Sequence, residues 1–413
     1  MLDVNPARLA TMATLFCNGL LYATWGVSVP VIKEKFGLSE GVLSLAMAAV
    51  AIGGIATMAA AGRWISRVGS GTASVRSGIL MALSAGPILL MWDFGGLLVL
   101  LFIYGMATAA NDVAANAQVA HLEQISKRSL IGSVHGSFSA GGLAGALLAS
   151  AWAAGNVTPA LNFICVAMPC LLAMVLAARF LRNDPLTHRE AEGAASGAHP
   201  GLDKEAGRRL RTLGALAFSA LVIEGAFYDW AAVYMRDIAH ANAGLVGFGY
   251  AAFAIAMAMG RMGGDWVRDR YSHQAVIATS GALSLAGLTV VLSNISPTAV
   301  IAGFFITGVG LSNVIPVLFS TAGKLANEAG WAASQGLATT TRIAYIGLLA
   351  GPLVIGPVAE MVGLQLAMVT LMAAVSATCG GWLLLSKRTD GAPWMLPRQR
   401  HVHPSCNRLS NSN

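Results

Sequence analysis

Long apolar blocks separated by short charged segments make up most of this chain. Twelve of the blocks approach the roughly 20 residues that an α-helix needs to cross a bilayer. Six lie in the first half, at Ala10–Ile32, Gly41–Gly62, Ser77–Trp92, Leu97–Gln118, Ile131–Ala154 and Ala160–Leu181. Six lie in the second half, at Leu213–Arg236, Gly244–Met262, Gln274–Asn294, Thr298–Ala322, Ser334–Ala359 and Gly363–Ser386. The pattern predicts an all-α membrane protein with twelve transmembrane helices.

The composition and the placement of the basic residues support this interpretation and orient the chain. The 413 residues are 56% hydrophobic and 11% charged, with a mean hydropathy of +0.66, whereas a soluble domain carries about 25% charged residues. Of the 26 Lys and Arg residues, 22 fall in the N-terminal segment, the even-numbered loops and the C-terminal tail. By the positive-inside rule, both termini are expected in the cytoplasm. The same asymmetry accounts for the net charge of +7, so no nucleic-acid partner is expected.

The sequence carries no motif of enzymatic or metal chemistry. It has no nucleotide-binding loop, no metal-ligand spacing and no nucleophile with an evident base, so we expect neither an enzyme nor a cofactor. Four of the five cysteines lie in predicted spans and Cys406 lies in the tail, which favours small buried side chains over a disulfide framework. The first apolar block is too long for a cleavable signal peptide and predicts a retained helix.

A repeated loop divides the chain into two related halves. The loop after the second block recurs 203 residues later, pairing Gly62 with Asp265, Ser66 with Asp269 and Arg67 with Arg270. An offset near half the chain length predicts two homologous six-helix bundles. We expect an N-terminal bundle over residues 1–181, a charged cytoplasmic linker over 182–211, a C-terminal bundle over 212–386 and a disordered cytoplasmic tail over 387–413.

Two carboxylates inside one apolar span are the leading functional candidates. The block Leu213–Arg236 carries Glu224 and Asp229. A charged side chain in hydrocarbon costs at least a few kcal/mol, so it normally faces a cavity or a partner. Burial favours the protonated form of a carboxyl group, so either residue could take up a proton. At 100° per residue the two point in different directions and can have different roles. A purely structural ion pair is the alternative.

Arg342 is the expected cationic partner of these acids. It is the only basic residue well inside a predicted span, and a guanidinium there requires an anion. Glu224, Asp229, Asp112 and an anionic substrate are the candidates. Counted at 1.5 Å per residue from the cytoplasmic ends of their helices, Arg342 and Glu224 lie at the most similar depths.

A polar cluster marks the N-terminal half. Asp112 follows Asn111 in the fourth span and shares a helical face with Asn116. The cluster could bind a polar solute, or it could only join helices and form an inner gate. His135, in the next span, could relay protons or could hydrogen-bond near the lipid headgroups.

Further polar and aromatic side chains are expected along a central cavity. Asn18, Tyr22 and Trp25 share one helical face, although ordinary helix–helix hydrogen bonding explains such residues equally well. Asn313 and Pro316 predict a bend in the tenth span, as two Gly-Pro pairs do in the eleventh. The expected cavity-lining residues are Asn18, Tyr22, Trp25, Asn111, Asn116, His135, Tyr228, Trp230, Asn313 and Tyr345.

Together these features resemble the major facilitator superfamily. The twelve spans, the two halves, the central linker and the repeated loop carry the resemblance, which covers nearly the whole chain. The family's loop reads roughly Gly-x-x-x-Asp-Arg-x-Gly, and this chain has Ser66 at the acidic position. In the second copy Asp265 replaces the first Gly, whereas Asp269 and Arg270 match the motif. The resemblance assigns the following residues at motif positions to a gating loop: Gly62, Arg67, Gly69, Asp265, Asp269 and Arg270.

Two shorter stretches are similar to the fucose permeases and to a bacterial inner-membrane branch beside them. Thr108-Ala-Ala-Asn111 and Glu224-Gly-Ala-Phe-Tyr-Asp229-Trp230 carry this similarity. Ala107 and Gly26 stand where the fucose permeases have acidic residues, so those proton-carrying acids are not carried over.

The resemblance implies a secondary transporter in a bacterial inner membrane that works by alternating access, as a monomer. We expect a small polar solute, sugar-like or a small organic acid, moved by proton symport with Glu224 or Asp229 as the titrating group. Efflux of amphipathic compounds is the alternative, and a non-transporting membrane sensor is a third possibility.

Overall fold

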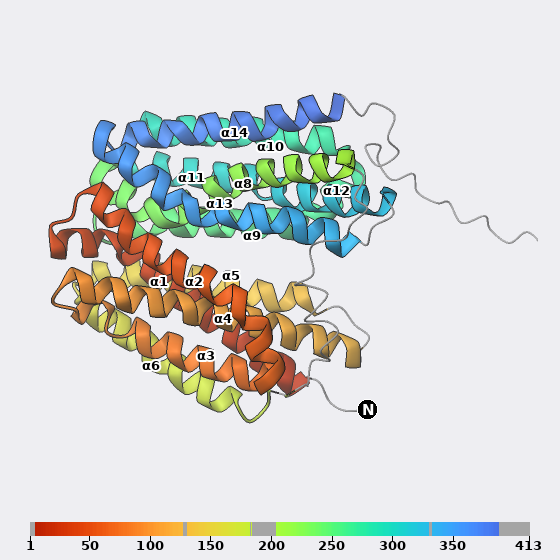
Figure 1. Ribbon diagram of the computed structural model, residues 1–413. Helices are drawn as coiled ribbons and strands as arrows, with labels where there is room; N and C mark the ends of the chain where they lie inside the picture. The colour runs from red at the N-terminus through yellow and green to blue at the C-terminus, as the bar shows by residue number, and fades with distance from the viewer. Residues whose placement is uncertain (1–4, 127–129, 182, 184–203, 330–332, 388–413) are drawn as a thin grey trace, which may run out of the picture.

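The computed structural model describes residues 5–126, 130–181, 183, 204–329 and 333–387 as helices joined by short turns (Figure 1). The first half contains α1 (Asn5–Phe36), α2 (Glu40–Val68), α3 (Ser70–Ala85), η1 (Ile88–Leu90), α4 (Phe94–Ser126), α5 (Ile131–Ala154) and α6 (Pro159–Ala177). The second half contains α8 (Lys204–Val233), η2 (Tyr234–Ile238), α9 (Val246–Arg270), α10 (His273–Ser293), α11 (Pro297–Leu311), α12 (Val314–Glu328), α13 (Ala333–Val362) and α14 (Leu364–Lys387).

The predicted all-α fold with twelve membrane spans is confirmed. Within the described part of the chain, 12 helical segments are long and apolar enough to cross a bilayer, and none of the described residues forms a strand. Several helices begin at a serine whose Oγ accepts a backbone N–H three residues on, as at Ser39, Ser272 and Ser296. Such caps satisfy amide groups that the first helical turn leaves unpaired.

Helix boundaries differ from the sequence-based expectation at two places. The tenth span is broken at Ser312 and Asn313 into α11 and α12, as Asn313 predicted, whereas α13 runs unbroken through Pro352 and Pro357. Helix α8 begins at Lys204, so residues 204–211 of the expected linker are helical. Residues 184–203 of that linker and 388–413 of the expected tail lie outside the described part.

The two halves form two six-helix bundles that use corresponding helix pairs (Figure 1). In the first bundle α1 packs on α5 so closely that a Cβ on Gly141 would lie 2.0 Å from the Phe16 carbonyl oxygen. In the second bundle α8 packs on α13 in the same way, with a Cβ on Gly347 falling 2.1 Å from the Phe218 carbonyl oxygen. Only glycine permits such contacts. The repeat inferred from the loops therefore extends to the packing of the helices.

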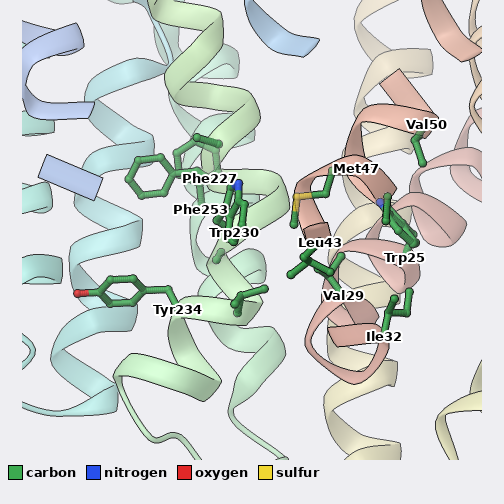
Figure 2. Close-up of a cluster of buried hydrophobic side chains, with 14 of the residues drawn as sticks. Trp25, Val29, Ile32, Leu43, Met47, Val50, Phe227, Trp230, Tyr234 and Phe253 are labelled. Atoms are coloured by element: carbon green, nitrogen blue, oxygen red, sulfur yellow. The ribbon is translucent and has the colours of Figure 1, made fainter. Parts of the chain in front are cut away.

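Among the described residues, buried apolar packing joins the bundles in one half of the molecule only. We call the end where α1 begins and α14 ends the terminal end, and the end where α1 turns into α2 the distal end. From the middle toward the distal end, one buried cluster spans both bundles, with Trp25 and Met47 on one side and Trp230 and Phe253 on the other (Figure 2). Toward the terminal end, the clusters stay within single bundles; one contains Leu122 and another contains residues 210 and 213 of α8.

Ion pairs reinforce the distal junction. Lys33 Nζ lies 2.7 Å from Asp237 Oδ2 across the bundles and 2.7 Å from Glu40 Oε1. Arg236, on the π-helical turn η2, lies 3.3 Å from Glu34 Oε2 and donates to the Pro30 carbonyl. We call the charged members the distal ion network: Lys33, Glu34, Glu40, Arg236 and Asp237. The bundles are thus joined at the distal end and separately packed at the terminal end.

Candidate functional site

Glu224 forms an ion pair with Arg261 at the centre of the C-terminal bundle. Glu224 lies on α8, and Nη2 of Arg261, on α9, lies 2.9 Å from both Glu224 carboxylate oxygens. The exposed fraction of the Glu224 side chain is 11%, and that of Arg261 is 43%. The expected pairing of Glu224 with Arg342 is therefore wrong. A charge-assisted contact to both oxygens is a strong one, and it accounts for the buried carboxylate.

Arg261 was not among the expected site residues because it lies one residue before Met262, where the eighth span was expected to end. It was therefore counted with the basic residues of the following loop. Helix α9 instead continues to Arg270, which moves Arg261 about 13 Å in from the helix end. The apolar Trp266 and Val267 that follow are the sequence signal for the longer helix.

Arg342 and Tyr345 lie on the terminal half of α13. Both are exposed within the isolated protein, Tyr345 by 41%. Tyr345 is close enough to Glu224 and Arg261 to interact electrostatically, and also to Asp112 of the opposite bundle. Tyr345 is therefore within electrostatic range of charged residues from both bundles.

Asp229 has a different environment from Glu224 although both are on α8. Its exposed fraction is 8%, and the described residues offer its carboxylate no hydrogen bond and no ion pair. Tyr22 of α1 and Tyr250 of α9 are within electrostatic range of it. The ring of Tyr228 lies 5.3 Å from that of Tyr250. Asp229 is thus a nearly buried acid among tyrosines, without a cationic side chain.

Asp112, Asn116 and His135 form a polar cluster in the N-terminal bundle. Asn116 Oδ1 lies 2.8 Å from His135 Nε2, and Asn116 Nδ2 donates to the Asp112 carbonyl at 2.9 Å. Asp112 is half-buried and within electrostatic range of His135, which is exposed. The three residues connect the middle of α4 to the terminal end of α5, so Asp112 has a polar connection toward that end.

Other expected cavity-lining residues instead join helices or fill the core. Asn18 donates to Asn111 Oδ1 at 3.2 Å, and Asn111 donates to the Ser74 carbonyl at 2.9 Å; both asparagines are fully buried. The helix-joining alternative therefore describes them. Asn313 accepts a 2.8 Å hydrogen bond from Arg268, likewise between helices. Trp25 and Trp230 were also expected to line the cavity. Their exposed fractions are 1% or less, and both lie in the apolar cluster.

The repeated loops lie at the terminal end. Gly69 ends α2 with φ of 85°, a backbone conformation that favours glycine, which explains this motif position. Gly62, Arg67 and Asp269 are exposed, and no ion pair of the described part joins Arg67 to Asp269. Arg270 stacks 4.9 Å from the Trp266 ring. The side chain of the remaining motif residue, Asp265, lies outside the described ones. The gating role of these loops stays a prediction.

No group of three or more His, Cys, Asp or Glu side chains that could hold a metal ion occurs among the residues described. The candidate functional groups at the centre are the Glu224–Arg261 ion pair, Asp229 among tyrosines, and Asp112 across the bundle junction.

Sequence comparisons agree with this architecture. A sequence profile of the Major Facilitator Superfamily matches residues 11–352. An MFS-type transporter of Yersinia pestis is 31% identical over 87% of this chain and 91% of its own length. Membrane protein MosC of Rhizobium meliloti is 28% identical over 94% of this chain and 93% of its own.

Solved structures share the fold at low identity. A mutant of the nucleoside transporter NupG matches with a TM-score of 0.74 at 10% identity, over 92% of this chain and 99% of its own. A bacterial homologue of the human lysosomal transporter Spinster, in an inward-facing and unoccupied conformation, matches with a TM-score of 0.72 at 14% identity, over 93% and 97%. At these identities the likeness shows the arrangement of helices alone.

Proposed function

The chain belongs to the major facilitator superfamily and transports across a membrane, and from this premise we propose that it moves a small polar solute by proton-coupled alternating access. The solute class, sugar-like or a small organic acid, is supported by the hydroxyl, carboxyl and guanidinium groups at the centre. Proton symport in a bacterial inner membrane is the form that we propose, and the relatives from Yersinia pestis and Rhizobium meliloti support a bacterial setting.

The structure corresponds, in this proposal, to the inward-open state. The excess of Lys and Arg at the terminal end assigns that end to the cytoplasm. The bundles are joined at the distal end by apolar packing and by the distal ion network. A solute would therefore reach the centre from the cytoplasm, and the opposite state would require the distal junction to open.

The Glu224–Arg261 ion pair carries the proposal. A proton on Glu224 removes the negative charge and leaves the Arg261 guanidinium, 2.9 Å away, without its anion. The loss of this ion pair removes a stabilising contact from the present arrangement of the bundles, so protonation changes which arrangement is stable. The freed guanidinium can bind a polar or anionic group of the solute.

Asp112 is the second anion that a freed Arg261 can reach. Tyr345 lies within electrostatic range of both residues, although they belong to different bundles. Closing the terminal half would bring Asp112 toward Arg261 and would give the guanidinium a new partner. Protonation of Glu224 and closure of the cytoplasmic side would then favour each other, which is the coupling that a symporter needs.

The test begins with a solute screen on the purified protein. A ligand of the folded state raises Tm by mass action, so sugars, sugar acids, amino acids and nucleosides are compared at two pH values. A hit is then assayed in proteoliposomes with Glu224→Gln and, as a matched control, Asp93→Asn, an exposed acid at the distal end. We expect Glu224→Gln to abolish accumulation driven by a pH gradient and to spare solute exchange. Gradient-driven accumulation at the wild-type rate would overturn the role of Glu224.

Efflux of amphipathic compounds is the second candidate. The aromatic rings near Asp229 favour it, because edge-to-face rings such as Tyr228 and Phe253, 5.2 Å apart, offer apolar surface to apolar groups. Increased drug sensitivity of a deletion strain, with no hit in the polar-solute screen, would favour efflux over uptake.

A further inference from the structure

We propose that Asp229 and three tyrosines around it, Tyr22, Tyr228 and Tyr250, bind the ammonium group of a small hydroxylated solute. The proposal rests on the transport function above and gives its solute a chemical class. The site consists of other residues than the Glu224–Arg261 pair, and unlike that pair it contains no cationic side chain. Below, this set of four residues is called the tyrosine site.

The charge of Asp229 requires a positive partner that the protein does not supply. Only 8% of the residue is exposed, and within the described part no arginine, lysine or histidine pairs with it. The nearest guanidinium of the centre, Arg261, is engaged with both oxygens of Glu224. A nearly buried carboxylate without a partner is strongly disfavoured, so it takes up either a proton or a cation from outside.

The side chains around Asp229 fit an organic cation. Tyr22 and Tyr250 lie within its electrostatic range, and the rings of Tyr228 and Tyr250 lie 5.3 Å apart at 53°. Aromatic faces attract ammonium groups through their quadrupole, and a carboxylate beside them adds a full opposite charge. An inorganic cation would instead require several oxygen ligands around it.

The hydroxyl groups of the same tyrosines fit the polar remainder of the solute. Among the described residues, none accepts or donates a hydrogen bond to the hydroxyl of Tyr22, Tyr228 or Tyr250. Polar groups inside a protein are normally paired. The phenols of Tyr22 and Tyr250 near the unpaired carboxylate of Asp229, with that of Tyr228 near Glu224 and Arg261, therefore indicate partners that come with a ligand. Solute hydroxyl groups can donate to and accept from these phenols.

The tyrosine site lies where the bundles meet. Tyr22 comes from α1 of the N-terminal bundle, whereas the other three residues come from α8 and α9. Gly26 of α1 brings its backbone against Tyr250, since a Cβ there would lie 3.0 Å from the ring and 3.2 Å from the Tyr228 carbonyl. Rocking of the bundles therefore changes the shape of the site, so a bound cation would be released or held according to the state of the transporter.

The test uses purified full-length protein and matched probes. Methylammonium chloride is compared with sodium chloride at equal ionic strength, and glucosamine with glucose, which differ by an amino group in place of a hydroxyl. Tm and intrinsic tryptophan fluorescence report binding. We expect the ammonium member of each pair to bind at least about tenfold more tightly, as one additional ionic contact would produce.

Three variants connect the effect to the tyrosine site. Asp229→Asn should abolish the preference for the ammonium probes. Tyr250→Phe should keep the preference, because the ring remains. Tyr250→Leu should reduce it at least about fivefold, because the aromatic face is lost. Asp93→Asn should behave as wild type. The melting curve and elution profile of each unliganded variant verify folding. A further readout needs no variant: in the wild-type protein, methylammonium should protect Asp229 from modification by a carbodiimide.

Several outcomes would overturn the proposal. Equal binding of the neutral and ammonium members would do so, as would an unchanged preference in Asp229→Asn. Protection by sodium equal to that by methylammonium would assign an inorganic cation, and no binding of any ammonium probe would leave Asp229 with a proton only. If the probes fail while Glu224→Gln still uncouples transport, the proposed function stands without this site. If the probes bind but are not transported, the site stands and the function falls.

Discussion

The two sets of ion pairs in this transporter differ in redundancy. In the distal ion network, Lys33 contacts Glu40 and Asp237 at 2.7 Å, and Arg236 contacts Glu34 and the same Asp237. At the centre, Arg261 contacts only one carboxylate, that of Glu224, in the described part of the chain. Loss of one contact in the distal network leaves both cations and the shared Asp237 with a partner, whereas loss of Arg261 at the centre leaves the buried Glu224 alone.

The distal ion network is suited to hold one conformation of the transporter, whereas the central pair is suited to change it. A network with shared partners resists a single neutralisation and suits a seal between the bundles. A single pair responds to one proton, and it lies between the half of the molecule where the bundles are joined and the half where they pack separately. The expected effects of substitutions on transport and stability therefore decrease from the centre to the distal end.

Removing Arg261 should have the largest effect. Arg261→Ala leaves Glu224 buried without its cation, which we expect to destabilise the protein by about 3 kcal/mol and to reduce transport more than about 100-fold. The melting temperature and the initial rate in proteoliposomes measure the two effects. Adding Glu224→Gln to this variant should restore most of the stability and none of the proton coupling. A double variant as unstable as the single one would contradict a direct pair.

Neutralising Asp112 should have the next largest effect. If Arg261 changes partner from Glu224 to Asp112 on closure, Asp112→Asn should slow transport about tenfold, a loss of about 1.4 kcal/mol of stabilisation in one state. Stability in the inward-open state should change little, because the structure shows no ion pair of Asp112 among the described residues. Exchange and net accumulation measured side by side test this, and an Asp112→Asn variant with normal rates would remove the residue from the mechanism.

A single change in the distal ion network should have a smaller effect. Lys33→Met removes one partner from Asp237, which keeps Arg236 at 2.7 Å, and removes the ion pair of Glu40, whose side chain is 27% exposed. We expect less than about a fivefold change in rate and a stability loss of about 1 kcal/mol or less, decreasing further at high salt. Combining Lys33→Met with Arg236→Met should exceed the sum of the single effects, because Asp237 then loses both partners. Additive effects would contradict the redundancy of the network.

The outermost member gives the smallest expected effect. The Glu34 side chain is 77% exposed and lies 3.3 Å from Arg236. Glu34→Gln should change stability by less than about 0.5 kcal/mol, as is usual for exposed pairs. A larger change in Tm would show that the distal network depends on each member, which would remove its contrast with the centre.

The sequence predicted the fold better than the partners of individual side chains. Hydrophobic block length located twelve spans, and Asn313 located the break between α11 and α12, because both depend on local composition. The position of Glu224 in a span was equally evident. Its partner was missed because the eighth span was expected to end at Met262, whereas α9 continues to Arg270, so Arg261 was grouped with the loop residues.

Side-chain direction was the second property that spacing could not decide. Asn18 and Tyr22 share a helical face in sequence, yet Asn18 is fully buried in bonds between helices whereas Tyr22 lies near Asp229. Trp25, on the same face, fills the apolar junction. Which part of a face meets a neighbouring helix depends on the packing of both bundles, which only the structure shows.

The central claim is that the charge of Glu224 determines which end of the transporter is closed, and spin-label distances test it most directly. In a cysteine-free background, one label pair at Val42 and Met361 reports the distal end, and another at Arg63 and Trp266 reports the terminal end; all four positions are exposed. We expect short distal and long terminal distances at high pH, and a shift to shorter terminal distances on acidification or with Glu224→Gln at high pH. Distance distributions that ignore both acidification and Glu224→Gln would contradict the account.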